Sequence, residues 1–456
     1  MPGSINMRYV LFLASTAALG GLLFGFDIAI ITGAGPFIAR RFRLGDLGLG
    51  WAFSSLLFGC VLGSLAAGKL ADRFGRKKLL LAVAVLFALT SIATGLAPDF
   101  TSFVTARFLA GLAVGAVSLL SPMYVSEIAP ASIRGRLGTL YQLSIVVGII
   151  ISYGINFLLR DVGANNWRWM FLTGVAPSAI FLAFVALAPE TPRFLVMRGR
   201  SREAHGVLER IGGTSSADAH VAEIAASMHA GRQSWRGLQR PGVRLALAAS
   251  AGLAILIHVS GINTIIDYAP TIFLSAGWNV TGALASTFIV GVTELLFTLV
   301  SLWAIDRFGR KPLYIVGSLG MAVSLLALVA AVLAGHFHGM VVLTLILAYL
   351  AFFSACIGPV FWTLVPEIFP NDVRGMAMTV PVLTQWVANA VVVLLFPAAF
   401  HVIGKAFTFG FLAFMALAQA IFTWVYVPET KHRSLEEIEH FWTQRQELRR
   451  RTASQE

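Results

Sequence analysis

The sequence predicts an all-α membrane protein with twelve transmembrane helices in two six-helix bundles. Hydrophobic residues fill 57% of the 456 positions and charged residues only 12%, whereas a soluble domain is about one-quarter charged. Twelve apolar runs approach or exceed the roughly 20 residues that cross a bilayer core. The six residues DRFGRK occur at 72–77 and again at 306–311, each time between two apolar runs. The chain is therefore expected to hold two copies of one membrane unit.

The expected helices are the apolar runs between charged or Pro/Gly-rich breaks. In order along the chain they lie at 8–34, 49–70, 79–97, 101–125, 138–159, 169–188, 245–276, 283–304, 313–335, 340–363, 376–400 and 406–427. Between the sixth and the seventh run, apolar residues at helical spacing predict short surface helices at 201–211 and 217–228.

Two further motif pairs repeat in the same order as DRFGRK. EIAPASIRG at 127–135 is matched by EIFPNDVRG at 367–375, and PETPR at 189–193 by PETK at 428–431. Copies that enter the membrane from the same side form a parallel repeat, which is common in transporters. We expect a six-helix bundle at 1–193, a cytoplasmic linker with short helices at 194–243, a second bundle at 244–427 and a cytoplasmic tail at 428–456.

The placement of basic residues predicts the orientation in the membrane. Lys and Arg gather at 69–78, within 189–244, at 307–311 and after 431, all on one side if the helices alternate. The positive-inside rule then puts both termini and the linker in the cytoplasm. A basic cluster at 40–43 opposes this but is outweighed. The net charge of +12 therefore indicates a protein that sits in a lipid bilayer, and nucleic acid is not expected as a partner.

Other function classes find little support. Cys60 and Cys356 both lie in apolar runs, which indicates packing residues and neither a disulfide framework nor a metal site. No nucleophile–base set, nucleotide-binding loop or metal cluster is apparent, so an enzyme is not expected.

The motifs together resemble the sugar porter family of the major facilitator superfamily. They are GKLADRFGRKK, PETPR, the two E-x-x-P-x-x-x-R-G sequences, SGIN at 260–263 and the closing PETK. The resemblance covers nearly the whole chain, and the closest pattern is that of bacterial sugar–proton symporters. It implies the major facilitator fold and import by alternating access.

The cytoplasmic motifs have the residue types for a gate made of ion pairs. Exposed ion pairs are worth about 0–1 kcal/mol each, so a gate needs several, and the alternative is local stabilisation of loops within each half. In the family this network closes the cytoplasmic side of the outward-facing state. The matching residues are Arg73, Arg76, Glu127, Arg134, Glu190, Arg307, Arg310, Glu367, Arg374 and Glu429.

An acid and a base inside the first half predict a proton site. Asp27 lies in the first apolar run, where a charge costs about 2.5–3.5 kcal/mol even on the lenient scale, and Arg107 opens the fourth run. In proton-coupled members of the family the matching acid takes the proton and the matching Arg is its partner. Gly174 stands where some symporters carry a further acid. The alternative is a structural ion pair. No cofactor is expected beyond the proton as coupling ion.

A sugar site needs amides for hydroxyl groups and an aromatic face for the ring. Phe24 and Trp386 are candidate lining residues, and Gly358, followed by Pro359, predicts a break in the tenth helix. Residues that match sugar-contact or pocket positions of the family are Gln142, Asn263, Trp362, Gln385 and Asn389.

The second half departs from the family pattern in a way that bears on specificity. A Gln-Gln pair is replaced by Ile257 and His258, an aromatic residue by Asp267 and an Asn by Glu294; Ile149 in the first half also replaces a Gln. No Lys or Arg lies in the apolar runs of the second half. The two acids are thus expected to be protonated, hydrated, bonded to His258 or neutralised by the solute.

We therefore expect proton-coupled import of a sugar or sugar-like solute by a functional monomer. A polyol, cyclitol or cationic amino sugar would suit the acids better than plain glucose or xylose. The alternative is that the acids are neutral and bind ordinary hydroxyls. A proton-independent uniporter is the alternative mechanism, and a non-transporting nutrient receptor a more distant one.

Overall fold

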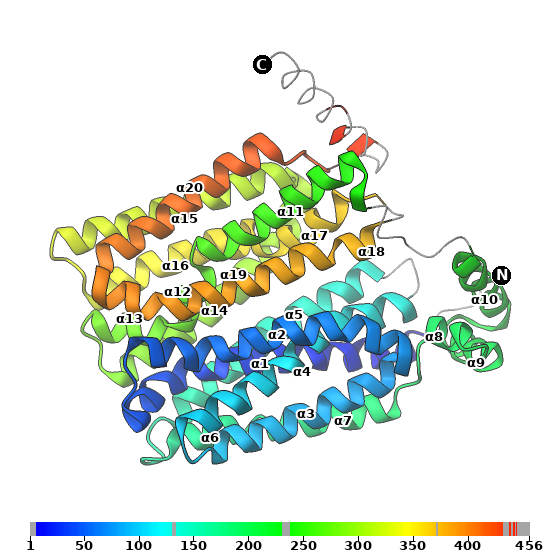
Figure 1. The fold of residues 1–456 in the computed structure, drawn as a ribbon, viewed down its shortest axis with the longest axis horizontal. Coiled ribbons are helices and arrows are strands. Elements are labelled where there is room, and N and C mark those ends of the chain that lie inside the picture. The colour runs from blue at the N-terminus through cyan, green and yellow to red at the C-terminus, as the bar shows by residue number, and fades with distance from the viewer. Residues whose placement is uncertain are drawn as a thin grey trace. The chain divides into compact units, whose positions relative to one another are not determined.

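The computed structural model describes residues 6–129, 134–229, 238–370 and 373–431, with 437–438, 441–442 and 444 of the tail. In these residues the chain is helical throughout and forms no strand (Figure 1). Twelve helices of the described chain are long and apolar enough to cross a membrane. The predicted all-α class and the twelve spans are therefore confirmed. Most of the predicted tail, and 230–237 of the linker, lie outside the described residues.

The chain forms two compact units, one of residues 1–42 and 55–232 and the other of 43–54 and 233–456. The predicted domain boundaries stay predictions. The helices of the first unit, with α2 beginning in the second, are α1 (Met7–Phe42), α2 (Asp46–Phe74), α3 (Arg76–Leu96), α4 (Phe100–Ile128), α5 (Arg134–Leu159), α6 (Asn166–Leu172), α7 (Val175–Leu187), α8 (Pro192–Met197), α9 (Ser201–Gly212) and α10 (Thr214–His229). Helices α9 and α10 fall on the two short helices expected in the linker.

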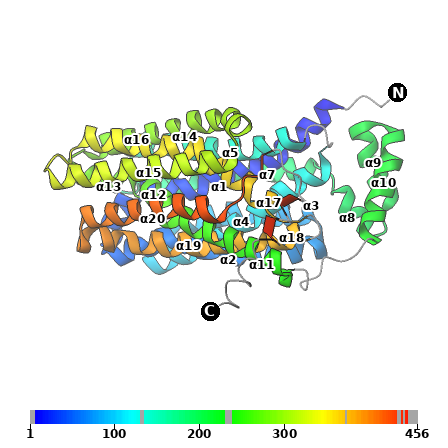
Figure 2. The ribbon, with the colours of Figure 1, turned by 90° about the horizontal axis from the view of Figure 1, so that it is seen from above.

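The second unit repeats the pattern of long apolar helices with more interruptions. Its elements are α11 (Pro241–Val259), α12 (Ile262–Asp267), α13 (Ala269–Ser275), α14 (Val280–Phe308), α15 (Arg310–Leu333), α16 (Gly339–Cys356), α17 (Gly358–Glu367), α18 (Arg374–Ala377), α19 (Thr379–Ala398), the π-helix η2 (Ala399–Ile403) and α20 (Lys405–Tyr426). Figure 2 gives the same helices in a view turned by 90°. The predicted break at Gly358 is confirmed, because α16 ends at Cys356 and α17 begins at Gly358.

Two helices differ from their predicted extent. The first continues past 34 to Phe42 with Pro36 inside it; proline is tolerated within membrane helices because neighbouring groups satisfy the freed carbonyl. The seventh, predicted as one run at 245–276, is three helices. It is interrupted at Gly261, whose φ of 97° is left-handed, and again at Tyr268. These breaks put residues of the candidate solute site at helix ends.

Each DRFGRK sequence is a sharp helix-to-helix corner. Gly75 and Gly309 separate the two helices of each copy with φ of 97° and 88°. A Cβ at Gly75 would lie 2.2 Å from Oε2 of Glu190, and a Cβ at Gly309 would lie 2.9 Å from Oε2 of Glu429. Glycine is therefore needed for its backbone conformation and for the close approach of a carboxylate.

Candidate functional site

Asp27 and Arg107 form a buried ion pair between α1 and α4. The Arg107 Nη1 donates to Oδ1 of Asp27 at 2.9 Å, and Nη2 donates to the main-chain oxygen of Asp27 at 3.0 Å. The two residues are 7% and 1% exposed. The guanidinium also lies 5.3 Å from the centre of the Phe171 ring on α6. The second carboxylate oxygen, Oδ2, is buried without a hydrogen-bond partner among the described residues.

Side chains of α5 hold the backbone of α1 around this pair. Ser152 donates to the oxygen of Phe26 at 3.0 Å, and Asn156 donates to the oxygen of Ile30 at 3.1 Å. The two helices approach closely because Gly25 faces the oxygen of Ile145, which a Cβ would meet at 1.9 Å. Sequence reasoning missed Ser152 and Asn156, although polar residues four apart in an apolar run share one helix face.

The second unit gathers several of the predicted solute residues. Gln385, Trp386 and Asn389 of α19 are 6%, 5% and 1% exposed. His258 of α11 lies within reach of a polar interaction with Gln385, but neither ring nitrogen makes a hydrogen bond of normal geometry to a described residue. The amide nitrogen of Asn389 also lacks a partner in the described chain. Together these groups leave unmet hydrogen-bonding capacity in an apolar interior.

The remaining solute candidates lie on other helices. Asn263 is half-buried and Asp267 buried on α12, which packs against α19. Glu294 sits in the middle of α14, and its Oε2 is buried with no hydrogen-bond partner in the described residues. Trp362 of α17 is 44% exposed. Gly358 begins that helix. Phe24 on α1 and Gln142 on α5 are half-buried and belong to the first unit.

The DRFGRK, E-x-x-P-x-x-x-R-G and PETPR motifs of the first unit form a network around Arg76. Its Nη2 lies 2.9 Å from Oε1 of Glu127 and 3.2 Å from Oδ1 of Asp72. Glu190 accepts hydrogen bonds from the backbone amides of Arg76 and Lys77 at 3.0 Å and 3.1 Å. Because these amides open α3, Glu190 neutralises the positive end of that helix.

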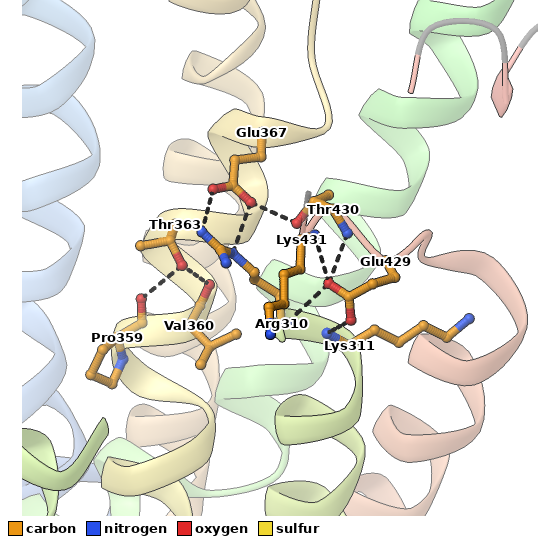
Figure 3. Close-up of polar contacts among 9 residues, drawn as sticks. All are labelled: Arg310, Lys311, Pro359, Val360, Thr363, Glu367, Glu429, Thr430 and Lys431. Atoms are coloured by element: carbon orange, nitrogen blue, oxygen red, sulfur yellow. Dashed lines mark hydrogen bonds and ion pairs between the residues drawn. The ribbon is translucent and has the colours of Figure 1, made fainter. Parts of the chain in front are cut away.

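The second unit has a corresponding network around Arg310, which Figure 3 shows. Arg310 makes a two-pronged contact with Glu367, at 3.1 Å from Nε and 2.9 Å from Nη2. Glu429 accepts from the amides of Arg310 and Lys311 at 3.1 Å and 3.0 Å. Thr430 donates to Glu367 at 2.6 Å. The closing PETK sequence therefore contacts the DRFGRK corner through Glu429 and the E-x-x-P-x-x-x-R-G motif through Thr430.

Each ion pair of these two networks joins residues of the same unit: Arg76–Glu127 in the first and Arg310–Glu367 in the second. Arg73 and Arg307 are exposed, each with its guanidinium over the ring of the following Phe. The structure does not describe the side chains of Arg134 and Arg374, so their predicted part in the network stays a prediction. Glu190 and Glu429 bind main-chain amides, a role that ion-pair reasoning from the motifs did not anticipate. A gate across the two bundles therefore stays a prediction.

In the described residues, no group of three His, Cys, Asp or Glu side chains is placed to hold a metal ion. Cys60 and Cys356 are free and buried.

Comparisons with known proteins place these features in a family. A family model for sugar (and other) transporters matches residues 13–442. The arabinose-proton symporter of Bacillus subtilis is 36% identical over 96% of both chains. The D-xylose-proton symporter of Escherichia coli is 36% identical over 98% of this chain and 99% of its own.

Solved structures agree. The xylose transporter XylE from Escherichia coli, in a partially occluded inward-open conformation, has a TM-score of 0.84 at 34% identity, covering 94% of this chain and all of that one. A structure of the XylE proton:xylose symporter bound to 6-bromo-6-deoxy-D-glucose has a TM-score of 0.79 at 35% identity, covering 96% and 100%. The chain is thus a multi-pass membrane protein that belongs to the sugar transporter family of the major facilitator superfamily.

Proposed function

We propose that this protein imports a sugar or sugar-like solute together with protons by alternating access. The observation that carries this proposal is the buried Asp27–Arg107 pair with its 2.9 Å contact. A carboxylate buried in an apolar helix needs a basic partner to stay ionised. When the carboxyl takes a proton it becomes neutral and no longer needs that partner. Relatives named as arabinose-proton and D-xylose-proton symporters support the same activity.

The geometry suggests how a proton is coupled to the conformational change. Ionised Asp27 holds the Arg107 guanidinium. When the carboxyl takes a proton, that ion pair is lost, but the hydrogen bond to the main-chain oxygen of Asp27 and the contact with Phe171 keep Arg107 in place. The loaded protein then turns inward, and proton and solute leave. Each charge moved across 100 mV supplies about 2.3 kcal/mol.

The proposal extends to what surrounds the site. The protein acts as a carrier and not as an enzyme, works as a monomer in the lipid bilayer, and uses the proton with no other cofactor. The clusters of Lys and Arg put both termini in the cytoplasm. The networks around Arg76 and Arg310 are proposed to close the cytoplasmic side during transport, together with Arg134 and Arg374.

Uptake into proteoliposomes tests the coupling. Labelled sugars, polyols and amino sugars are offered under an imposed proton gradient. We expect accumulation of at least one solute by the wild type, and its loss in Asp27→Asn with solute exchange retained. Asp161→Asn is the matched control, since Asp161 is 75% exposed in its side chain and pairs only with the neighbouring Arg160. Equilibration of the solute at the same rate with and without the gradient, and no accumulation above the outside concentration, would identify a uniporter instead.

The solute class is proposed from the second unit. Glu294 and the buried Asp267 would offer carboxyl groups to a polyol, a cyclitol or an amino sugar, and Gln385 and Asn389 would offer amides; α12, which carries Asp267, packs against α19, which carries both amides. We expect the double variant Asp267→Asn/Glu294→Gln to lose preference for such solutes over glucose and xylose. Equal transport of ordinary hexoses by the wild type and the double variant would contradict this proposal and leave the proton coupling intact.

A further inference from the structure

A groove in the first unit adjoins the network around Arg76 and contains basic side chains that the proposed transport cycle does not use. It has a volume of about 1260 Å³ and lies between the corner of α2 and α3 on one side and α8 and α9 on the other. We call it the basic groove after the basic side chains in its lining, which are Arg73, Lys77, Lys78, Arg198, Arg200 and Arg210. Every one of its walls belongs to the first unit, so the groove does not depend on the placement of the second.

The acidic side chains of the basic groove are already engaged. Glu190 accepts the amides at the start of α3. Glu203 is bonded by Arg200 through two contacts of 2.6 Å, and these hydrogen bonds lower the pKa of Glu203, which stays ionised and neutralises that Arg. Glu209 lies 3.9 Å from His205. Three acids face six bases, and the lining keeps an excess of positive charge.

Two of the bases are free to bind an anion. Lys78 and Arg210 are exposed and have no hydrogen bond or ion pair in the part of the chain that the structure describes. Lys77, by contrast, donates to the oxygen of Ala186 at 2.8 Å. The second DRFGRK copy has Pro312 where the first has Lys78. The Lys78 amine therefore has no counterpart at the second corner and is not needed for the contacts that the two corners share.

The basic groove opens onto an apolar strip of α3. Starting from Lys78, residues three or four apart share one face of the helix. Leu81 lines the groove itself, and the following members of that face are exposed, namely Val85, Leu89, Ile92 and Leu96. Lys78 thus stands at the cytoplasmic end of an exposed apolar strip that runs the length of a membrane-spanning helix.

We propose that the basic groove binds one anionic phospholipid of the cytoplasmic leaflet. Its phosphate lies between Lys78 and Arg210, and one acyl chain follows the α3 strip. Basic pockets at that level of the membrane attract anionic head groups, and Arg adds two-pronged hydrogen bonds to phosphate. A soluble phosphate compound would use the cations but leave the apolar strip without an occupant. The two cations that hold the phosphate, Lys78 and Arg210, have no role in the proposed transport cycle.

Lipid binding to the full-length protein in detergent, followed by native mass spectrometry, tests the proposal. Phosphatidylglycerol is titrated against phosphatidylcholine with the same acyl chains. Because each surface cation is worth about 1 kcal/mol toward anionic lipid, we expect Lys78→Gln/Arg210→Gln to weaken phosphatidylglycerol binding roughly 10- to 30-fold. The matched control is Lys69→Gln/Arg202→Gln, which removes the same charge from α2 and α9 at residues that do not line the groove.

Three results would overturn the proposal. These are equal weakening in the control variant, equal affinity for phosphatidylcholine, and full displacement of the lipid by millimolar glycerol 3-phosphate, which would indicate a soluble anion instead. A second measurement needs no variant. Phosphatidylglycerol with a photoreactive acyl chain should label the 81–92 segment of wild-type α3, and labelling spread evenly over all helices would contradict the site.

Discussion

Asp27 in the first unit and Glu294 in the second are both carboxyls in the middle of apolar helices, yet their surroundings differ. Asp27 has a built-in counterion in Arg107 at 2.9 Å. Glu294 has a buried oxygen with no hydrogen-bond partner in the described residues. The first arrangement gives the carboxylate a counterion, although its Oδ2 has no hydrogen-bond partner in the described residues, and its charge changes when a proton arrives. The second leaves unmet polar groups, which a hydroxyl-rich solute would satisfy.

The difference is confined to the membrane interior. At the DRFGRK corners the two units are alike: Glu190 caps α3 as Glu429 caps α15, and Arg76 contacts Glu127 as Arg310 contacts Glu367. The copies have therefore kept their corners and diverged in the polar residues between the helices. The four predictions below test this contrast.

The largest effect is expected from removing the counterion of Asp27. Arg107→Gln leaves a buried carboxylate without its partner, and breaking such a pair costs about 3–5 kcal/mol. We expect a marked fall in the thermal unfolding midpoint and in the yield of folded protein. The double variant Asp27→Asn/Arg107→Gln should recover most of the stability but not the proton-driven uptake. Equal instability of both variants would show that Arg107 acts mainly through packing.

The two corners should respond alike to the loss of their capping carboxylates. Glu190→Gln and Glu429→Gln each weaken hydrogen bonds to several backbone amides and remove a charge from a helix N-terminus, at a cost of about 2 kcal/mol. Thermal unfolding of the two variants should shift by similar amounts. A large shift in one variant alone would mean that the corners, too, have diverged.

Composition and the repeat were enough to predict the helices, because membrane insertion requires apolar runs of fixed length. The three-part seventh helix was not predicted, since the left-handed Gly261 depends on packing against Leu412. In the site, the pairing of Asp27 with Arg107 was expected from their charges and from the family resemblance, and the two side chains are in contact. The approach of His258 to Gln385 was not predicted, because the two residues are far apart in the chain. Ser152 and Asn156 were missed because they donate hydrogen bonds to main-chain oxygens, and a sequence motif does not identify such acceptors.

Two buried asparagines give a smaller, matched test. Asn156 donates to the oxygen of Ile30, so Asn156→Leu removes that hydrogen bond between α5 and α1 at a cost of about 0.5–1.5 kcal/mol. The amide nitrogen of Asn389 has no partner among the described residues, so Asn389→Leu should leave the unfolding midpoint unchanged or raise it while weakening solute binding. A destabilised Asn389→Leu would mean that Asn389, like Asn156, has a structural role in the helix packing.

The smallest effect on stability is expected at Glu294. Glu294→Gln keeps the shape and hydrogen-bonding capacity of the side chain and removes an acid for which the described residues supply no counterion, so thermal unfolding should not shift downward. The KM for the transported solute should rise up to about tenfold, equivalent to about 1.4 kcal/mol. Ser301→Ala, at another buried polar residue of α14, is the control and should change neither quantity. If Glu294→Gln destabilised the protein as Arg107→Gln does, the acid would have a structural partner, and the contrast between the two halves would not hold.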